Sequence, residues 1–200
     1  MVLSWCGCAT SGRPPSPSIY KYFEGDEKLS AEFLALDREP ISATRDGRPI
    51  WKVDKPVIQF TSLDGPTPAT SKSRRELQLR ALGRRFSATI TDYADDKTVR
   101  RLRLLSRPLL SYSSPEDQTH GAIFAFVVAT DPDVLLLIES TEKNGMRTWE
   151  YAVGRLSINA SRVQLDDKLV WKVAEHESPY ERPREGYSIW DAIGQSTLSP

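Results

Sequence analysis

Residues 46–53 read DGRPIWKV and residues 166–173 read DDKLVWKV, so one short pattern occurs twice, 120 positions apart. Both blocks open with aspartate and close with the same Trp-Lys-Val triplet. A repeat at a fixed offset is typical of a duplicated structural unit. Asp-Gly is also a strong signal for a two-residue hairpin turn, so we expect residues 41–45 and 48–53 to pair as antiparallel strands. The Asp-Asp of the second block is a weaker form of the same signal.

The repeat extends upstream of both blocks. Residues 30–35 (SAEFLA) face residues 148–153 (TWEYAV) at an offset of 118, and residues 18–23 face the apolar run at 134–139. In both copies the earlier segment is followed by an acidic turn that contains glycine. The pattern therefore predicts two related β units within one chain.

The expected domain organisation follows from this alignment. It comprises a first, amino-terminally truncated β repeat at 1–55, a linker and helix at 56–97, a second β repeat at 98–175 and a polar tail at 176–200, all in one compact domain. The second copy opens with a strand ahead of Gly121, for which the first copy has no room because Met1 already faces Ala122. We therefore expect that the first strand has been lost or that translation starts upstream of Met1.

One convincing helix lies between the two copies. Ser73 and Glu76 have the spacing of a capping box. The apolar positions that follow recur every three or four residues, at Leu79, Leu82, Phe86 and Ile90. This spacing predicts a helix over 74–91 with a single apolar stripe. Such a stripe has to be buried, and the natural surface for it is one face of a β-sheet.

The residues after the helix alternate between strand-like segments and turns. We expect strands at 98–105, 108–113, 121–130, 134–141, 148–158, 160–166 and 169–174. The run from Ile123 to Val128 is apolar on both faces, which is typical of a central strand covered on both sides. In the polar tail, Tyr187, Ile189 and Trp190 are expected to dock back. The sequence therefore predicts a β-rich α+β fold, with antiparallel strands in two related units and one main α-helix.

The charge balance argues against a nucleic-acid-binding protein. The 200 residues include 27 basic and 27 acidic ones, for a net charge of zero, whereas nonspecific nucleic-acid binding leaves a basic footprint. The one basic cluster falls in the predicted helix, where we interpret it as the solvated face: Lys72, Arg74, Arg75, Arg80, Arg84 and Arg85. No apolar run approaches the roughly 18–20 residues that span a bilayer. We therefore expect no nucleic-acid partner and no membrane span.

The sequence lacks the common motifs of catalysis and metal binding. It contains no G-x-S-x-G elbow, P-loop or G-x-G-x-x-G loop. Cys6 and Cys8 supply at most half of a zinc site, since there is no second Cys pair and no His pair. The two histidines, His120 and His176, match no known metal pattern, and we interpret both as solvated loop residues. We therefore expect no catalytic residue, no metal and no cofactor.

Aromatic residues of the second copy are the best candidates for a binding site. Trp149, Tyr151 and Val153 share one face of their expected strand, and Glu150 lies on the other face. The predicted binding residues are Trp149, Tyr151, Glu150 and Arg155. Two interpretations stay open: the aromatic side chains fill the core of a sheet, or they form the wall of a pocket at the interface of the copies.

Several segments carry a resemblance to other proteins. They are ALGRRFSAT (81–89), LRLLSRPL (102–109), GAIFAFV (121–127), TDPDVLLLIE (130–139), WEYA (149–152) and VW (170–171). Together they resemble a large group of uncharacterised bacterial hypothetical proteins with a duplicated β unit. The resemblance covers most of the chain and implies two complete copies, with export in many members, but no known activity. The chain departs from the group at His120, where an acidic residue is usual, so no catalytic role is carried over to that position.

The leading functional hypothesis is a non-catalytic binding or interaction domain. The alternative is a hydrolase-like enzyme with a site formed from scattered Asp, Glu and His, which a deep pocket joining Asp117, His120 and another carboxylate would favour. The partner is unknown; a second copy that pairs through open sheet edges and another protein are both candidates. The location is left open: from the sequence as written we expect no signal peptide and a cytoplasmic protein, whereas the resemblance implies export if translation starts upstream.

Overall fold

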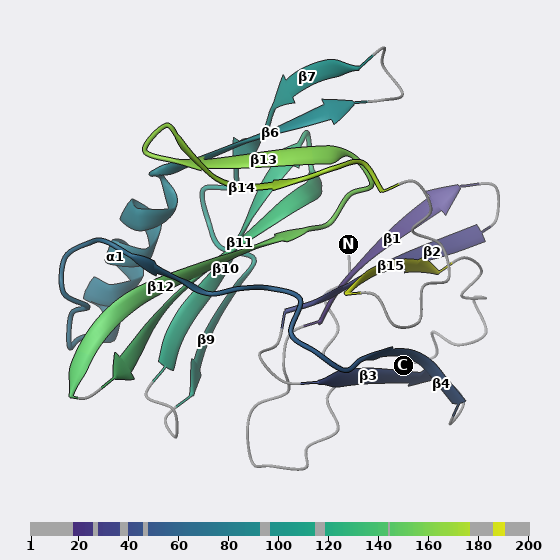
Figure 1. The fold of residues 1–200 in the computed structure, drawn as a ribbon. Helices are drawn as coiled ribbons and strands as arrows, with labels where there is room; N and C mark the ends of the chain where they lie inside the picture. The colour runs from purple at the N-terminus through teal and green to yellow at the C-terminus, as the bar shows by residue number, and fades with distance from the viewer. Residues whose placement is uncertain are drawn as a thin grey trace. The chain divides into compact units, whose positions relative to one another are not determined.

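The computed structural model of the chain describes residues 18–25, 28–36, 40–45, 48–92, 97–114, 119–143, 145–176 and 186–190. These residues form one α-helix and fifteen strands, and every strand pairing among them is antiparallel (Figure 1). The expected β-rich fold with one helix is confirmed. Within these residues, no helix combines the length and the apolar character needed to cross a bilayer.

The chain divides into two compact units. Unit 1 comprises Met1–Ile58 and Glu177–Pro200, and unit 2 comprises Gln59–His176. The four-part division expected from the sequence stays a prediction.

Unit 1 contains two small sheets. Its strands are β1 (Ser18–Gly25), β2 (Lys28–Ala35), β3 (Ile41–Arg45), β4 (Arg48–Val53) and β15 (Tyr187–Trp190). One sheet has the order β1-β2-β15, and the β3–β4 hairpin forms the other. The rings of Phe33 and Trp51 pack with their centroids 5.5 Å apart. The tail docks back as expected, because Tyr187 and Ile189 are buried and the Tyr187 hydroxyl donates a hydrogen bond to Glu32 Oε1 at 3.2 Å.

Unit 2 contains a central sheet, a four-stranded sheet and the helix. The central sheet has the spatial order β5 (Thr61–Leu63), β12 (Met146–Arg155), β11 (Asp131–Lys143), β10 (Thr119–Val128) and β8 (Arg103–Leu104), and β9 (Leu110–Ser114) also pairs with β10. The four-stranded sheet has the order β14 (Lys168–Val173), β13 (Ala160–Leu165), β6 (Phe86–Asp92) and β7 (Thr98–Arg101). The helix, α1 (Lys72–Gly83), contacts β10 and β11 (Figure 1).

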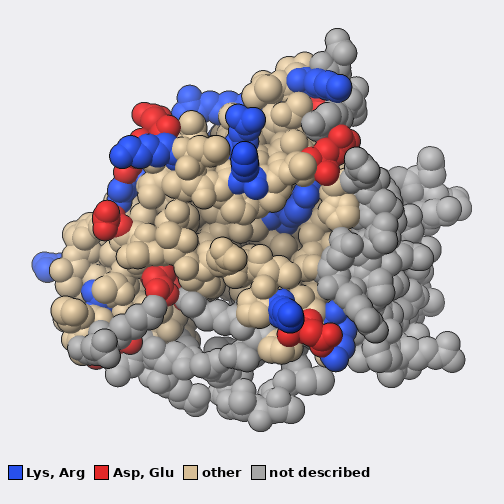
Figure 2. All heavy atoms as spheres, in the orientation of Figure 1, with Lys and Arg blue, Asp and Glu red and all other residues tan. Residues whose placement is uncertain are grey.

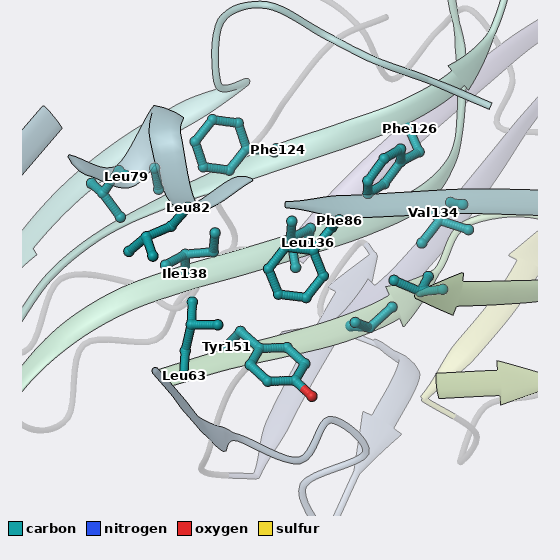
Figure 3. Close-up of a cluster of buried hydrophobic side chains, with 14 of the residues drawn as sticks. Leu63, Leu79, Leu82, Phe86, Phe124, Phe126, Val134, Leu136, Ile138 and Tyr151 are labelled. Carbon is teal, nitrogen blue, oxygen red and sulfur yellow. The ribbon is translucent and has the colours of Figure 1, made fainter. Parts of the chain in front are cut away.

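One face of the central sheet forms the core of unit 2. As Figure 3 shows, its side chains come from α1 (Leu79, Leu82), β6 (Phe86), β10 (Phe124, Phe126), β11 (Val134, Leu136, Ile138) and β12 (Tyr151). Full burial of such a side chain contributes about 1.5–3 kcal/mol, so this cluster holds the helix and the four-stranded sheet against the central sheet. Strand β10 is covered on both faces, as its apolar run predicts, because Ile123 and Phe124 point to opposite sides and both are buried.

The helix is shorter than the sequence predicts. It ends at Gly83 rather than at residue 91, and β6 begins at Phe86. Side chains four positions apart lie on the same side of a helix and also of a strand, so the spacing of Leu82, Phe86 and Ile90 fits both structures. In β6, buried residues alternate with half-buried ones. The β-branched residues of this segment favour the strand.

The start of the helix also differs from the prediction. Ser71 occupies the N-cap position without a side-chain cap bond, so the capping box of Ser73 and Glu76 does not form. The Gln78 side chain instead accepts a hydrogen bond from the amide of Ala69 at 2.8 Å. This bond ties the loop before the helix to its second turn.

The two Trp-Lys-Val blocks form hairpins of identical register. In β13–β14, Val163 faces Trp171, and in β3–β4, Ala43 faces Trp51. In both hairpins the register shifts immediately after that pair, between residues 163 and 164 and between residues 43 and 44. Each pair of one hairpin therefore corresponds to a pair of the other, at the offset of 120 found in the sequence.

The preceding hairpins also share one register. Ser18 faces Ala35 in β1–β2, Leu136 faces Val153 in β11–β12, and every later pair corresponds at an offset of 118. Strand β1 therefore corresponds to β11 from Leu136 onward. The structure therefore matches Ser18 to Leu136, whereas the apolar pattern of the sequence matched Ser18 to Val134, two positions earlier.

The strand that follows each Trp-Lys-Val hairpin in the chain belongs to the other unit and pairs with a strand of that unit. Strand β5 follows β4 in the chain and pairs with β12, and β15 follows β14 and pairs with β2. In these pairings Thr61 faces Tyr151 and Ser188 faces Phe33. Residues 33 and 151 are equivalent at the offset of 118, so the two added strands occupy equivalent places.

Candidate functional site

Two predicted binding residues, Trp149 and Tyr151, lie in the core of unit 2. Trp149 Nε1 donates a hydrogen bond to the carbonyl oxygen of Pro66 at 2.7 Å. The Tyr151 ring packs on Phe86 with the centroids 5.0 Å apart, and burial raises the pKa of the Tyr151 hydroxyl. Both side chains are placed where the core-filling interpretation expects them. A binding role for them stays a prediction.

The other two candidates, Glu150 and Arg155, lie apart from this aromatic pair. Glu150 is on the opposite face of β12 and faces Glu139 of β11. Arg155 donates hydrogen bonds to four backbone carbonyl oxygens: those of Ser157 (2.9 Å), Ile158 (2.8 Å), Asn159 (3.3 Å) and Ala174 (3.1 Å). These bonds tie the loop after β12 to the end of β14. The structure therefore does not bring the four candidates together in one site.

A polar contact that sequence reasoning missed crosses the second face of the central sheet. Tyr112 of β9 and Glu139 of β11 both face Gly121 of β10. The Tyr112 hydroxyl donates a hydrogen bond to Glu139 Oε2 at 2.9 Å. A Cβ atom on Gly121 would lie 2.5 Å from Cζ of Tyr112. The tyrosine ring can therefore cross β10 only because residue 121 has no side chain.

His120 is buried, which corrects the expectation of a solvated loop residue. Strand β10 begins two residues before Gly121, so His120 lies within the sheet, and only 3% of its surface is exposed. The Ser113 hydroxyl, on the facing residue of β9, lies 2.8 Å from His120 Nδ1. Burial, and after it the positive charge of Arg75, lowers the pKa of the imidazole. The imidazole ring of His120 is therefore neutral at pH 7. Asp117, which the sequence suggested as a carboxylate neighbour of His120, lies outside the described residues.

A small pocket lies next to this pair, between α1 and the strands β9 and β10. Its walls include Glu76 and Arg80 of α1 together with Ser111 and Ala122, which form the next cross-strand pair on the same face. Its volume is about 110 Å³. Typical small-molecule sites are larger, at roughly 300–1,000 Å³. Among the described residues, no group of three or more His, Cys, Asp and Glu side chains is placed to hold a metal ion.

Three basic side chains line up across the outer face of the four-stranded sheet. Lys172 of β14 faces Arg162 of β13, Arg162 faces Thr89 of β6, and Thr89 faces Arg101 of β7. Cross-strand partners project from the same face, and neighbouring strands are about 4.8 Å apart. We call Arg101, Arg162 and Lys172 the cationic row. All three side chains are exposed, and within the described part of the chain none of these side chains forms a hydrogen bond or an ion pair.

The described residues that share this outer face include no acidic residue. By register and exposure they are Ala160, Gln164, Ser87, Thr91, Val99 and Leu169. Figure 2 shows basic side chains over the region where β7, β13 and β14 lie in Figure 1. In the β13–β14 turn, Asp166 accepts a hydrogen bond from Arg85 Nε at 3.1 Å, which lowers the pKa of the Asp166 carboxyl. That carboxylate is therefore already paired with a cation outside the row.

The corresponding hairpin of unit 1 has one cation instead of two at the positions equivalent to Arg162 and Lys172. At the offset of 120, Arg162 and Lys172 correspond to Ser42 and Lys52, which also face each other. Lys52 forms an ion pair with Asp54 at 2.8 Å. A hairpin of the same register therefore forms with a single, neutralised cation at these two positions, so the fold itself does not require the cationic row.

No family model, curated protein or solved structure matches the chain. The resemblance to a group of bacterial proteins therefore stays a prediction. The residues that the fold brings together are therefore the basis for a functional proposal.

Proposed function

We propose that this chain is a non-catalytic binding domain whose cationic row engages an anionic partner. The observation that carries the proposal is the direct facing of Arg162 and Lys172 on an outer sheet face without a neutralising carboxylate. Like charges in directly opposed positions destabilise a sheet. An anion bound over the row removes this repulsion, so binding converts an unfavourable arrangement into a favourable one.

We also infer that the two sets of hairpins are copies of one β unit. The shared registers, the matching register shifts and the equivalent places of β5 and β15 support this duplication. The copies then serve as an internal comparison. The position that holds Arg162 in one copy holds Ser42 in the other, so the cationic row is a property of unit 2 that the common architecture leaves optional.

The proposal is tested with a soluble polyanion and the full chain. Fluorescein-labelled dextran sulfate is titrated with the protein, and binding is followed by fluorescence anisotropy at 50 and 150 mM salt. The test variant carries Arg101→Gln, Arg162→Gln and Lys172→Gln. We expect its affinity to fall by about 3- to 150-fold, because three exposed ion pairs are lost and each contributes about 0.2–1 kcal/mol. Added salt should weaken binding by the parent chain.

The matched control removes three exposed cations from the helix and from the residue that caps its C-terminal end. It carries Lys72→Gln, Arg74→Gln and Arg84→Gln, which change the net charge by the same amount. We expect the control to keep most of the affinity. An equal loss in both variants, or no binding of dextran sulfate by the parent chain, would reject the cationic row as a binding surface.

A second candidate function rests on the contact between Ser113 and His120. A serine hydroxyl next to a neutral imidazole is the arrangement in which histidine acts as a general base and serine as a nucleophile. Here the contact is made by Nδ1 at 2.8 Å, beside a small pocket. Ser111 occupies the next position on the same face of β9 and provides a control residue.

This hydrolase alternative is tested with a fluorophosphonate probe that labels activated serine. Labelling that is lost in Ser113→Ala and His120→Gln but retained in Ser111→Ala would establish the enzyme. Labelling that is equal in the parent chain and Ser113→Ala would exclude it.

A further inference from the structure

Two exposed apolar side chains flank the cationic row on the same face. Leu169 of β14 faces Gln164 and is 50% exposed, and Val99 of β7 faces Thr91 and is 67% exposed. Residues two positions apart on a strand share one face. Val99 therefore lies on the same face as Arg101. Leu169 lies on that face too, because its cross-strand partner Gln164 is two positions from Arg162. The outer face therefore combines a line of cations with an apolar side chain on each of its outermost strands.

We propose that the anionic partner is the surface of a bilayer that contains anionic phospholipid; this inference rests on the proposed function of the row. Charge complementarity places Arg101, Arg162 and Lys172 against lipid phosphates. Leu169 and Val99 then reach the boundary between headgroups and acyl chains, where exposed apolar side chains are stabilised. The hydroxyl of Thr89, between Arg162 and Arg101, can donate a hydrogen bond to the same phosphates.

The composition of the face favours a bilayer over a single-stranded nucleic acid. Binding of single strands relies on aromatic side chains on which bases stack. None of the described outward residues of this sheet is aromatic. Trp171, on the edge strand, packs against the core cluster instead. A single-stranded nucleic acid would meet cations here but no stacking surface.

The expected strength follows from these groups. Each Lys or Arg at the membrane surface strengthens partition by about fivefold, so three of them give roughly 100-fold. Burial of the exposed parts of Leu169 and Val99 adds about fivefold for each side chain. We therefore expect binding to vesicles that contain phosphatidylglycerol and little binding to vesicles of phosphatidylcholine alone.

The experiment compares vesicle co-sedimentation of the full chain with dextran sulfate binding. The vesicles contain phosphatidylcholine with or without 30% phosphatidylglycerol. The apolar test variant carries Val99→Ser and Leu169→Ser. Its control carries Leu77→Ser and Met146→Ser, two side chains with 63% and 68% exposure on other elements. The charge variants are the two described above, and thermal melts establish that all variants are folded.

The inference predicts that the parent chain sediments with phosphatidylglycerol vesicles. Loss of the row should reduce vesicle binding about 100-fold, and Val99→Ser with Leu169→Ser should reduce it while leaving dextran sulfate binding unchanged. Binding of dextran sulfate without binding of vesicles would overturn the bilayer inference and leave the proposed function standing. Binding of neither probe would overturn both. Equal vesicle binding by the apolar variant and the parent chain would overturn the inference as well.

Discussion

Replacement of Gly121 by alanine should destabilise the protein through a single tyrosine. The Tyr112 ring reaches from β9 across β10 to Glu139 on β11, and Gly121 lies beneath it. A Cβ at this position would lie 2.5 Å from Cζ and 2.6 Å from the hydroxyl oxygen of Tyr112, and 2.9 Å from Cβ of Glu139. The Tyr112 ring would have to leave its place to relieve the first two contacts, and Glu139 Cβ could move away only together with its backbone.

The magnitude follows from two contributions. Overpacking of a close-packed site costs about 1–3 kcal/mol. Displacement of the ring also breaks the 2.9 Å hydrogen bond to Glu139, and a hydrogen bond to a charged group contributes about 1.5–3 kcal/mol. We therefore expect Gly121→Ala to lower the free energy of unfolding by about 2.5–6 kcal/mol.

Urea unfolding followed by tryptophan fluorescence measures this change. Tyr112→Ala removes the ring, so Gly121→Ala should cost at least about 1 kcal/mol less in that background. Gly83→Ala is the control: its Cβ would lie 3.7 Å from the Phe124 ring, an ordinary contact, and alanine favours a helix by up to about 1 kcal/mol. Costs of Gly121→Ala that agree within about 0.5 kcal/mol in the two backgrounds would refute the steric explanation.

Three further predictions concern stability. Burial lowers the folded-state pKa of His120 below the 6.5 of an exposed histidine, so the unfolded chain binds the proton at a higher pH than the folded chain does. The free energy of unfolding should therefore fall as the pH drops below about 6.5, and His120→Gln should flatten this part of the pH profile. Trp51 is 1% exposed and Trp171 is half-buried, so Trp51→Ala should cost about 3–5 kcal/mol in urea unfolding and Trp171→Ala clearly less; equal costs would contradict this. Tyr187→Phe removes the hydrogen bond to Glu32, and a calorimetric melt should show a loss of about 1–3 kcal/mol; an unchanged melt would show that β15 does not depend on that bond.

The hairpins could be predicted because their signals are local. An Asp-Gly turn between strand-like segments specifies β3–β4, and the repeat carries the same assignment to β13–β14. The helix boundary could not be predicted in this way. Leu82, Phe86 and Ile90 keep a spacing that a helix and a strand both accept, and the pairing of β6 with β13 and β7 decides between them. That pairing joins segments far apart in the sequence.

The candidate site shows the same division between local and distant information. Trp149 and Tyr151 were correctly assigned to one face of a strand, but the sequence could not say whether that face was core or pocket. Arg101, Arg162 and Lys172 belong to no common motif. Only the register of four strands places them in one row, so no inspection of the sequence alone could have assembled them.

The salt dependence of dextran sulfate binding tests the role of the cationic row most directly, because it counts the cations that contact a polyanion. Release of condensed counterions makes the logarithm of the binding constant fall linearly with the logarithm of the salt concentration, by about 0.7–0.9 for each contact. Replacement of Arg101, Arg162 and Lys172 by glutamine should therefore make this slope shallower by about 2–3, whereas the helix control should keep the parent slope. An unchanged slope in the row variant, or an equal change in the control, would contradict binding through the cationic row.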